Sequence, residues 1–172
     1  MCCSALLLAL AVPADAATGG AQPNIPTGGA TVTASAKLTT ARSASAPSGA
    51  PAEVQAAIAE ANEIVGKPYV WGGGHRSFTS RGYDCSGAVS YLLHGGGLLA
   101  SPLDSSSFMR WGARGPGRWI TVWTNPSHAF VEIAGLRLDT SAAEDPSGRK
   151  GPQWRHARRS HAGFRARHPI GF

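Results

Sequence analysis

The stretch GYDCSGAVSY, residues 82–91, contains a cysteine at the point where a helix is predicted to begin. The residues from Cys85 to Leu93 predict that helix, and the glycines at 95–97 end it. A thiol at a helix N-terminus lies at the positive end of the helix dipole, which stabilises the thiolate and lowers the pKa of the thiol. The stretch therefore indicates a nucleophilic cysteine, and the alternative is a small buried core residue.

A cysteine nucleophile needs an imidazole base, and a third polar group must orient that base. His128 begins a predicted strand directly after the Asn-Pro-Ser turn at 125–127, and Asp139 lies on the next predicted strand, across the turn at Gly135. An even number of loop residues would put both side chains on one face of the sheet, because side chains alternate along strands. The alternatives are a surface histidine and a carboxylate that caps the turn at Thr140.

Helices precede strands in the predicted order of elements, which is typical of an α+β fold. A helix is predicted over 51–65, where Val54, Ile58 and Ala61 form an apolar stripe and Gly66 ends the helix. Four strands are predicted, at 119–124, 128–133, 136–140 and 164–168. The expected architecture is a pair of N-terminal helices packed on a small antiparallel sheet.

Four segments resemble the NlpC family of papain-like bacterial cell-wall endopeptidases. They are GKPYVWGG at 66–73, GYDCSGAVSY at 82–91, SHAFVEI at 127–133 and LRLDTS at 136–141. The resemblance covers about residues 53–140, and its most specific part is the Tyr-x-Trp-Gly-Gly segment followed closely by Asp-Cys-Ser-Gly. The family's usual Pro-Gly-Asp-Leu segment is missing ahead of the histidine, and an aspartate stands where the family often has histidine or asparagine. Both departures indicate a divergent member.

The resemblance implies a papain-like fold in which Cys85 is the nucleophile, His128 the base and Asp139 the third catalytic residue. It implies an exported cysteine peptidase that hydrolyses a stem-peptide bond of bacterial peptidoglycan, between D-glutamate and a diamino acid. One alternative is a peptidoglycan amidase with the same Cys–His chemistry, which cuts between the sugar and the stem peptide. Another is an inactive module that binds the wall.

The resemblance also implies residues that bind substrate. Tyr69 would line the site near the oxyanion, while Asp84 and Ser86 would receive the free amine of the peptide. The neighbouring Trp71 is expected in the core, as most such aromatic residues are. The other histidines are expected in turns or in solvent: His75, His94, His156, His161 and His168.

No cofactor is implied by the sequence. It contains neither CxxC nor HExxH, so a metal site has no support, and no Gly-Lys-Ser/Thr follows the glycines at 72–74, which excludes a phosphate loop. No apolar run reaches the roughly 18 residues that a membrane helix needs. The net charge of +6 suits an anionic partner, and for an exported protein that partner is not expected to be nucleic acid.

The chain of 172 residues divides into three predicted regions. Residues 1–16 are typical of a signal peptide, and residues 17–50, rich in Ala, Gly, Ser, Thr and Pro, of a disordered linker. The folded domain is expected at 51–172, because every aromatic residue lies at or beyond Tyr69. Its last part, 146–172, has seven Arg or Lys residues and no acid. That segment either binds anionic wall polymers or is solvated and partly disordered. The protein is expected to be secreted or associated with the wall, and periplasmic in a Gram-negative organism.

Overall fold

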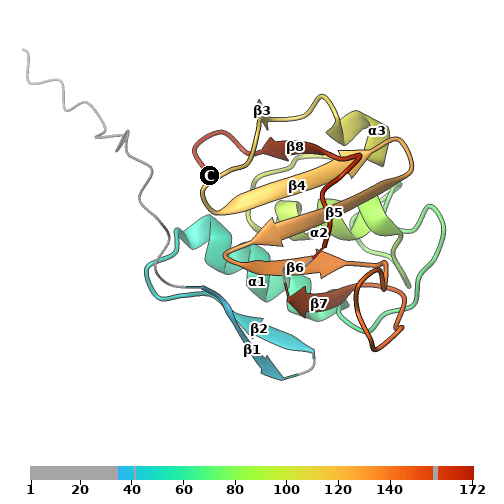
Figure 1. The fold of residues 1–172 in the computed structure, drawn as a ribbon, viewed down its shortest axis with the longest axis horizontal. Coiled ribbons are helices and arrows are strands. Elements are labelled where there is room, and N and C mark those ends of the chain that lie inside the picture. The colour runs from blue at the N-terminus through green and yellow to red at the C-terminus, as the bar shows by residue number, and fades with distance from the viewer. Residues whose placement is uncertain (1–34, 41, 157–158) are drawn as a thin grey trace, which may run out of the picture.

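A computed structural model describes residues 35–40, 42–156 and 159–172, and three helices and eight strands follow one another along them (Figure 1). The helices are α1 (Ala52–Ile64), α2 (Cys85–Gly95) and α3 (Ser105–Phe108). The strands are β1 (Lys37–Thr40), β2 (Ser43–Ser45), β3 (Ala113–Arg114), β4 (Ile120–Asn125), β5 (His128–Ile133), β6 (Leu136–Asp139), β7 (Gln153–His156) and β8 (Arg165–His168).

Six of these strands form one antiparallel sheet in the order β3-β8-β4-β5-β6-β7. In the view of Figure 1, α1 and α2 lie behind this sheet and cover one of its faces. The core between the two layers contains Val54 and Ile58 of α1, Leu92 of α2, and Val131 and Ile133 of β5, all 0–1% exposed. The predicted α+β class, with helices packed on an antiparallel sheet, is confirmed.

Helix α1 forms where its apolar stripe predicts it. Pro51 precedes the first turn with a φ of −53°, and Gly66 follows the helix with a φ of +88°, a conformation that glycine adopts without strain. Helix α2 likewise begins at Cys85, as predicted, and extends to Gly95. The nucleophile candidate therefore lies at the N-terminus of a helix.

The central strands follow their predicted positions, and their turns are tight. Asn125 pairs with His128 across one turn, and Ile133 pairs with Leu136 across the other. The second turn contains only Ala134 and Gly135, with φ values of +46° and +84°. A two-residue turn with two positive φ angles suits the twist of a hairpin.

The linker prediction for 17–50 is wrong where the structure describes that region. Strands β1 and β2 form a hairpin, and the side chain of Asn62 on α1 holds it by accepting from Ala44 N at 2.9 Å and donating to Ala44 O at 3.0 Å. Ala36 N also donates to Ala134 O at 2.7 Å, beside the central sheet. The prediction failed because small residues such as alanine do not indicate burial in a sequence. Hydrogen bonds between the two strands and from Asn62 hold this hairpin, so it needs little buried side-chain area. The predicted signal peptide, 1–16, lies outside the described residues.

The described parts of the basic C-terminal segment, 146–156 and 159–172, are folded. They are therefore not a partly disordered tail. Strand β7 pairs with β6, and β8 inserts between β3 and β4. Of these two strands, only β8 coincides with a predicted strand. Strand β7 was not predicted, because the basic residues in and around it suggested a solvated surface. Arg155 of β7 is nevertheless buried, since its guanidinium pairs with Asp145 and donates to Asp139 O. None of the helices in the described part of the chain is long and apolar enough to span a membrane.

Candidate active site

The helix that carries Cys85 begins against a glycine-rich loop, and Asp84 joins the two. Its carboxylate accepts from Gly87 N at 2.8 Å, which caps α2, and from Gly72 N at 3.0 Å. The packing is close, because a Cβ on Gly87 would lie 1.9 Å from Gly73 O. The glycines of the two motifs therefore let the loop backbone reach the start of the helix.

Cys85 is the first residue of α2 and is 8% exposed. Its thiol is hydrogen-bonded to the His128 side chain, and Ala129 N donates to the sulfur. It is a free cysteine, as the nucleophile role requires. A buried core cysteine would not meet an imidazole, a backbone N–H and a helix N-terminus together, so the geometry favours the reactive alternative.

His128 is fixed by the turn before it. The side chain of Asn125 accepts from Ser127 N at 3.0 Å and from His128 N at 2.9 Å, which sets the start of β5. His128 Nε2 lies 3.0 Å from Asp139 Oδ1, which leaves Nδ1 for the thiol of Cys85. The imidazole thus bridges a thiol and a carboxylate.

Asp139 is the last residue of β6 and its side chain is fully buried. His128 and Asp139 each lie an odd number of residues from the paired Val131 and Leu138, so both project from the face opposite to that pair. This agrees with the shared face expected from the sequence. Asp139 Oδ1 also accepts from Ser141 N at 2.8 Å, so the carboxylate caps the turn and contacts the base at once.

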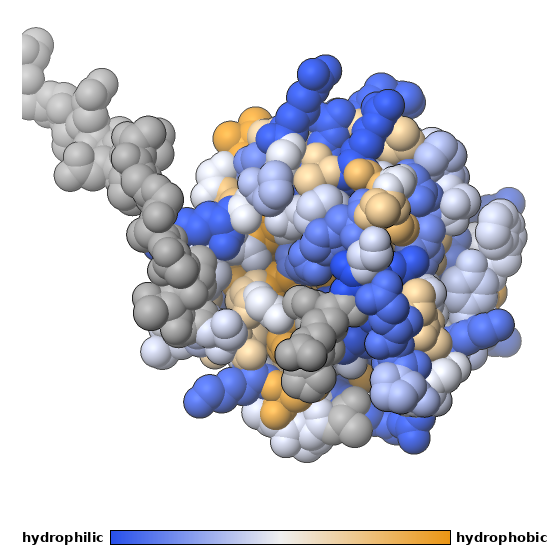
Figure 2. All heavy atoms as spheres, in the orientation of Figure 1, coloured by the Kyte–Doolittle hydropathy of each residue, from blue (hydrophilic) through white to orange (hydrophobic). Residues whose placement is uncertain are grey.

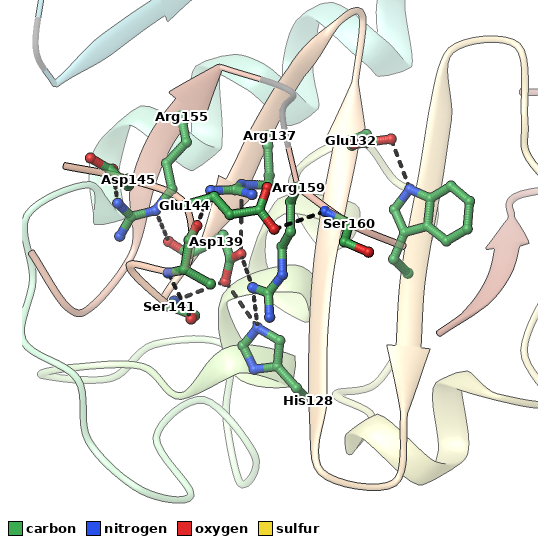
Figure 3. Close-up of polar contacts among 12 residues, drawn as sticks. His128, Glu132, Arg137, Asp139, Ser141, Glu144, Asp145, Arg155, Arg159 and Ser160 are labelled. Carbon is green, nitrogen blue, oxygen red and sulfur yellow. Dashed lines mark hydrogen bonds and ion pairs between the residues drawn. The ribbon is translucent and has the colours of Figure 1, made fainter. Parts of the chain in front are cut away.

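Arginine side chains gather around Asp139, which no sequence pattern had indicated (Figure 3). Arg159 Nη1 lies 2.5 Å from Asp139 Oδ2, and Arg137 Nε lies 3.6 Å from the same oxygen. Burial is the largest influence on the pKa of Asp139 and would raise it, but hydrogen bonds from His128 and Ser141 and the positive charges of His128 and Arg159 lower it overall. Asp139 is therefore ionised at neutral pH.

The thiol and the imidazole stabilise each other's charged forms. Burial would raise the pKa of Cys85, but the hydrogen bond and charge of His128 and the N–H of Ala129 lower it overall. Burial would lower the pKa of His128, but Asp139 and Cys85 raise it from 6.5 to about 9. The contact between the two groups therefore favours a thiolate beside an imidazolium.

Tyr69, which the resemblance assigns to the site, lies near Cys85 and His128. Burial raises the pKa of its hydroxyl, and the charges of Cys85 and Asp84 raise it further. Tyr69 and His128 line one pocket of about 280 Å³, together with Thr140, Ser141, Ala142 and Lys150. The neighbouring Trp71 is 86% exposed, so its expected place in the core is wrong.

Asp84 and Ser86, the residues expected to receive an amine, are 4% and 2% exposed and already have partners. His75 Nε2 lies 2.9 Å from Asp84 Oδ2 and 3.0 Å from Ser86 Oγ. Sequence reasoning placed His75 in a turn without a role. The glycines at 72–74, directly before His75, were the sequence feature that could have indicated its contact with Asp84.

Other histidines are also engaged rather than solvated. His161 lies 2.9 Å from Glu132 and stacks on Trp123 at 3.7 Å between ring centroids. His94 stacks on Phe78 at 3.8 Å. No group of three or more His, Cys, Asp or Glu side chains within residues 35–40, 42–156 and 159–172 could hold a metal ion.

No protein-family model and no curated protein sequence matches the chain. Solved structures do match. The peptidoglycan hydrolase RipB of Mycobacterium tuberculosis has a TM-score of 0.51 at 24% identity, over 69% of this chain and 65% of its own. An NlpC/P60 family protein of Bacillus cereus has a TM-score of 0.50 at 18% identity, over 68% of this chain and 40% of its own.

A third match is RipD of M. tuberculosis, described as a non-catalytic NlpC/p60 domain protein adapted to peptidoglycan binding. Its TM-score is 0.50 at 17% identity, over 70% of this chain and 100% of its own. This chain spans less than two thirds of the RipB and B. cereus chains. The shared feature is the fold: an α+β, papain-like domain. It is the fold of NlpC/P60 proteins, which confirms the family resemblance of the motifs at the level of structure.

Proposed function

We propose that this protein is a divergent NlpC/P60 cysteine peptidase that hydrolyses a stem-peptide bond of bacterial peptidoglycan. One observation carries the proposal: the Cys85 thiol, at the start of α2, is hydrogen-bonded to an imidazole that a buried carboxylate holds. These are the three parts that thiol acyl transfer needs, namely a nucleophile, a base and a group that orients the base.

In the first half of the reaction, the Cys85 thiolate attacks the carbonyl carbon of the scissile bond. The backbone N–H at the start of α2 can stabilise the oxyanion, and the Tyr69 hydroxyl is a second donor beside the sulfur. The His128 imidazolium then gives its proton to the leaving amine. A thioester between Cys85 and the substrate acyl group remains.

In the second half, a water molecule attacks the thioester. His128, now neutral, takes a proton from the water, and the Cys85 thiolate leaves as the carboxylic acid forms. Asp139 stabilises the imidazolium each time it appears, without taking a proton itself, because Arg159 and Arg137 keep the carboxylate ionised.

The proposed bond is that between D-glutamate and a diamino acid. The pocket beside His128 has Lys150 at its lining, a cation suited to a carboxylate of the stem peptide. A role of the Asp84 and Ser86 pair in receiving the free amine belongs to the same proposal, and His75 would have to move for it. The protein would act outside the cytoplasm, at the wall, with residues 1–16 serving as its signal peptide.

An amidase with the same chemistry, cutting between sugar and peptide, is the nearest alternative. A non-catalytic wall-binding module is a second candidate, favoured by the match with RipD. The linked Cys85, His128 and Asp139 side chains favour catalysis over binding alone, since binding needs no thiol paired with a base.

Digestion of purified peptidoglycan, with the products sized by mass spectrometry, tests the proposal. A peptidase releases fragments that begin with the diamino acid, and it leaves peptides that end at D-glutamate on the sugar. An amidase releases whole stem peptides. Binding of the protein to the sacculi without any product, under conditions in which a thiol-reactive probe also fails to label Cys85, supports the wall-binding module.

A further inference from the structure

In the proposed mechanism, Arg159 serves only to keep Asp139 ionised. It follows β7 in the basic segment that was expected to bind anionic polymers or to be solvated, yet its side chain is only 13% exposed. The guanidinium lies against two aromatic rings that pack edge to face, 4.9 Å from the centroid of Phe130 and 5.3 Å from that of Phe164. A cation held against two ring faces has few alternative positions, so its contacts with the site are persistent.

Two atoms of the site are within reach of one guanidinium nitrogen. Arg159 Nη1 lies 2.5 Å from Asp139 Oδ2 and 3.3 Å from His128 Nε2 (Figure 3). Asp139 Oδ1 faces His128 Nε2 at 3.0 Å, so the carboxylate is shared between the base and the arginine. Arg159 therefore fixes the oxygen that the imidazole does not use.

The contact with His128 depends on where the imidazole carries its protons. A guanidinium nitrogen can only donate. When Nε2 is protonated, it and Arg159 Nη1 are two donors and two positive groups 3.3 Å apart, competing for one carboxylate. Loss of the Nδ1 proton to the leaving amine removes the positive charge of the ring, and with it the repulsion from Arg159. The arginine thus opposes the imidazolium that Asp139 and Cys85 favour.

We propose that Arg159 is a positioning residue of the proposed Cys85–His128 site, which holds the Asp139 carboxylate and makes the His128 imidazolium a stronger acid. The benefit is in the transfer of a proton to the leaving amine. An imidazolium stabilised by the buried Asp139 carboxylate would release that proton slowly, and a fixed cation beside Nε2 offsets part of that stabilisation. This inference rests on the proposed function.

Several charged or titratable groups face His128 from the elements around it, and the test must separate Arg159 from them. They are Cys85 of α2, Asp139 of β6 with Arg137 behind it, Tyr69 of the loop before α2, and Lys150 of the loop before β7. Arg159 differs from Arg137 and Lys150 in its direct contact with Nε2.

The experiment follows the rate of alkylation of Cys85 by iodoacetamide from pH 5 to pH 11. A thiolate paired with an imidazolium gives two steps, and the upper step marks the loss of the His128 proton, which His128→Ala must remove. In Arg159→Gln we expect the upper step to move to higher pH by about one unit, since a neighbouring cation is lost. In Arg159→Lys, which keeps the charge, we expect it to stay.

Arg165→Gln is the matched control. Arg165 is exposed on β8, and its substitution removes one positive charge from the same basic C-terminal segment. Circular dichroism confirms folding, and Arg159→Met, which keeps a long unbranched side chain beside the rings, replaces the Gln variant if that one unfolds. The role of Arg159 is overturned if the upper step stays in place in Arg159→Gln or Arg159→Met. It is also overturned if Arg159→Lys and Arg165→Gln move the step as far as the neutral variant does. A wild-type profile without any step that depends on His128 contradicts the proposed Cys85–His128 pair itself.

Discussion

His75 Nε2 lies 2.9 Å from Asp84 Oδ2, on the carboxylate that also caps the helix of the nucleophile. The imidazole is one third exposed, while Asp84 is buried. His75 therefore contacts the pair, Asp84 and Ser86, to which the family resemblance assigns a substrate amine. An amine could reach the carboxylate only after His75 has turned away.

Replacing His75 should consequently change the specificity of the proposed peptidase. In His75→Ala we expect KM for a stem peptide with a free amine to fall about tenfold, the value of one hydrogen-bond contact of about 1.4 kcal/mol, at unchanged kcat. The same peptide with an acetylated amine should show no change. Steady-state kinetics on both peptides measure this, with His94→Ala as the control, because His94 stacks on Phe78 away from the thiol. Equal effects on the two peptides would show that no amine binds there.

Cys85→Ala should abolish hydrolysis and leave the fold intact. The substitution removes one sulfur atom whose partners, His128 and Ala129 N, can be solvated at the edge of the site. We expect the free energy of unfolding to change by no more than about 1 kcal/mol. Product release from peptidoglycan and thermal unfolding measure the two effects. A large loss of stability would support a core role for the thiol, and residual hydrolysis would exclude it as nucleophile.

A chain that begins at Pro51 should be less stable than one that begins at Ser35, but equally active per folded molecule. The shorter chain lacks the β1–β2 hairpin, and Asn62 loses both hydrogen bonds to Ala44. Two such bonds and the buried alanines indicate a loss of about 2–3 kcal/mol. Urea unfolding tests the loss. Asn62→Ala in the longer chain removes the two hairpin hydrogen bonds together with the one that Trp154 Nε1 donates to Asn62 Oδ1 at 2.8 Å, so its loss of stability sets an upper limit on the two bonds. A shorter chain that folds normally but is inactive would give the hairpin a part in catalysis.

The side chains of the proposed triad were predictable because local rules place each of them. The helix start at Cys85 follows from the motif and the glycines, and the strand parity of His128 and Asp139 follows from a two-residue turn at Gly135. Such rules act over a few residues and have few competing solutions. What they left open was whether the thiol and the imidazole meet, since α2 and β5 are distant in sequence.

The remaining contacts of the site depend on tertiary packing that has no local signature. Arg159 reaches Asp139 because β7 and β8 take separate places in the sheet, and no periodicity announces a buried arginine. The hydrophilic side chains seen over much of the surface in Figure 2 show why basic residues are usually assigned to solvent. Trp71 shows the opposite error: as an aromatic residue it was expected in the core, but it is exposed.

Loss of His128 and loss of Asp139 should differ in both rate and stability. His128→Ala removes the proton acceptor and the donor to the leaving amine, so we expect the rate to fall by about 10²–10⁴-fold or more. Asp139→Ala only removes the orienting group, so its effect on rate should be smaller. It also removes the carboxylate that Arg137 and Arg159 share, however, and removing one partner of a buried ion pair costs about 3–5 kcal/mol.

The pH dependence of kcat/KM separates the two roles further. The pKa of His128 is about 9 in the folded protein and 6.5 without its partners, so its contribution to stability is complete below pH 6.5 and is lost as the pH rises through about 9. Wild-type activity should have an alkaline limit near pH 9 for the same reason. In Asp139→Ala that limit should move to lower pH, because a negative neighbour is lost and Arg159 remains. Asp139→Asn, which keeps the size of the side chain, should show the same direction. An alkaline limit that stays in place in both variants would assign the third catalytic role to another residue.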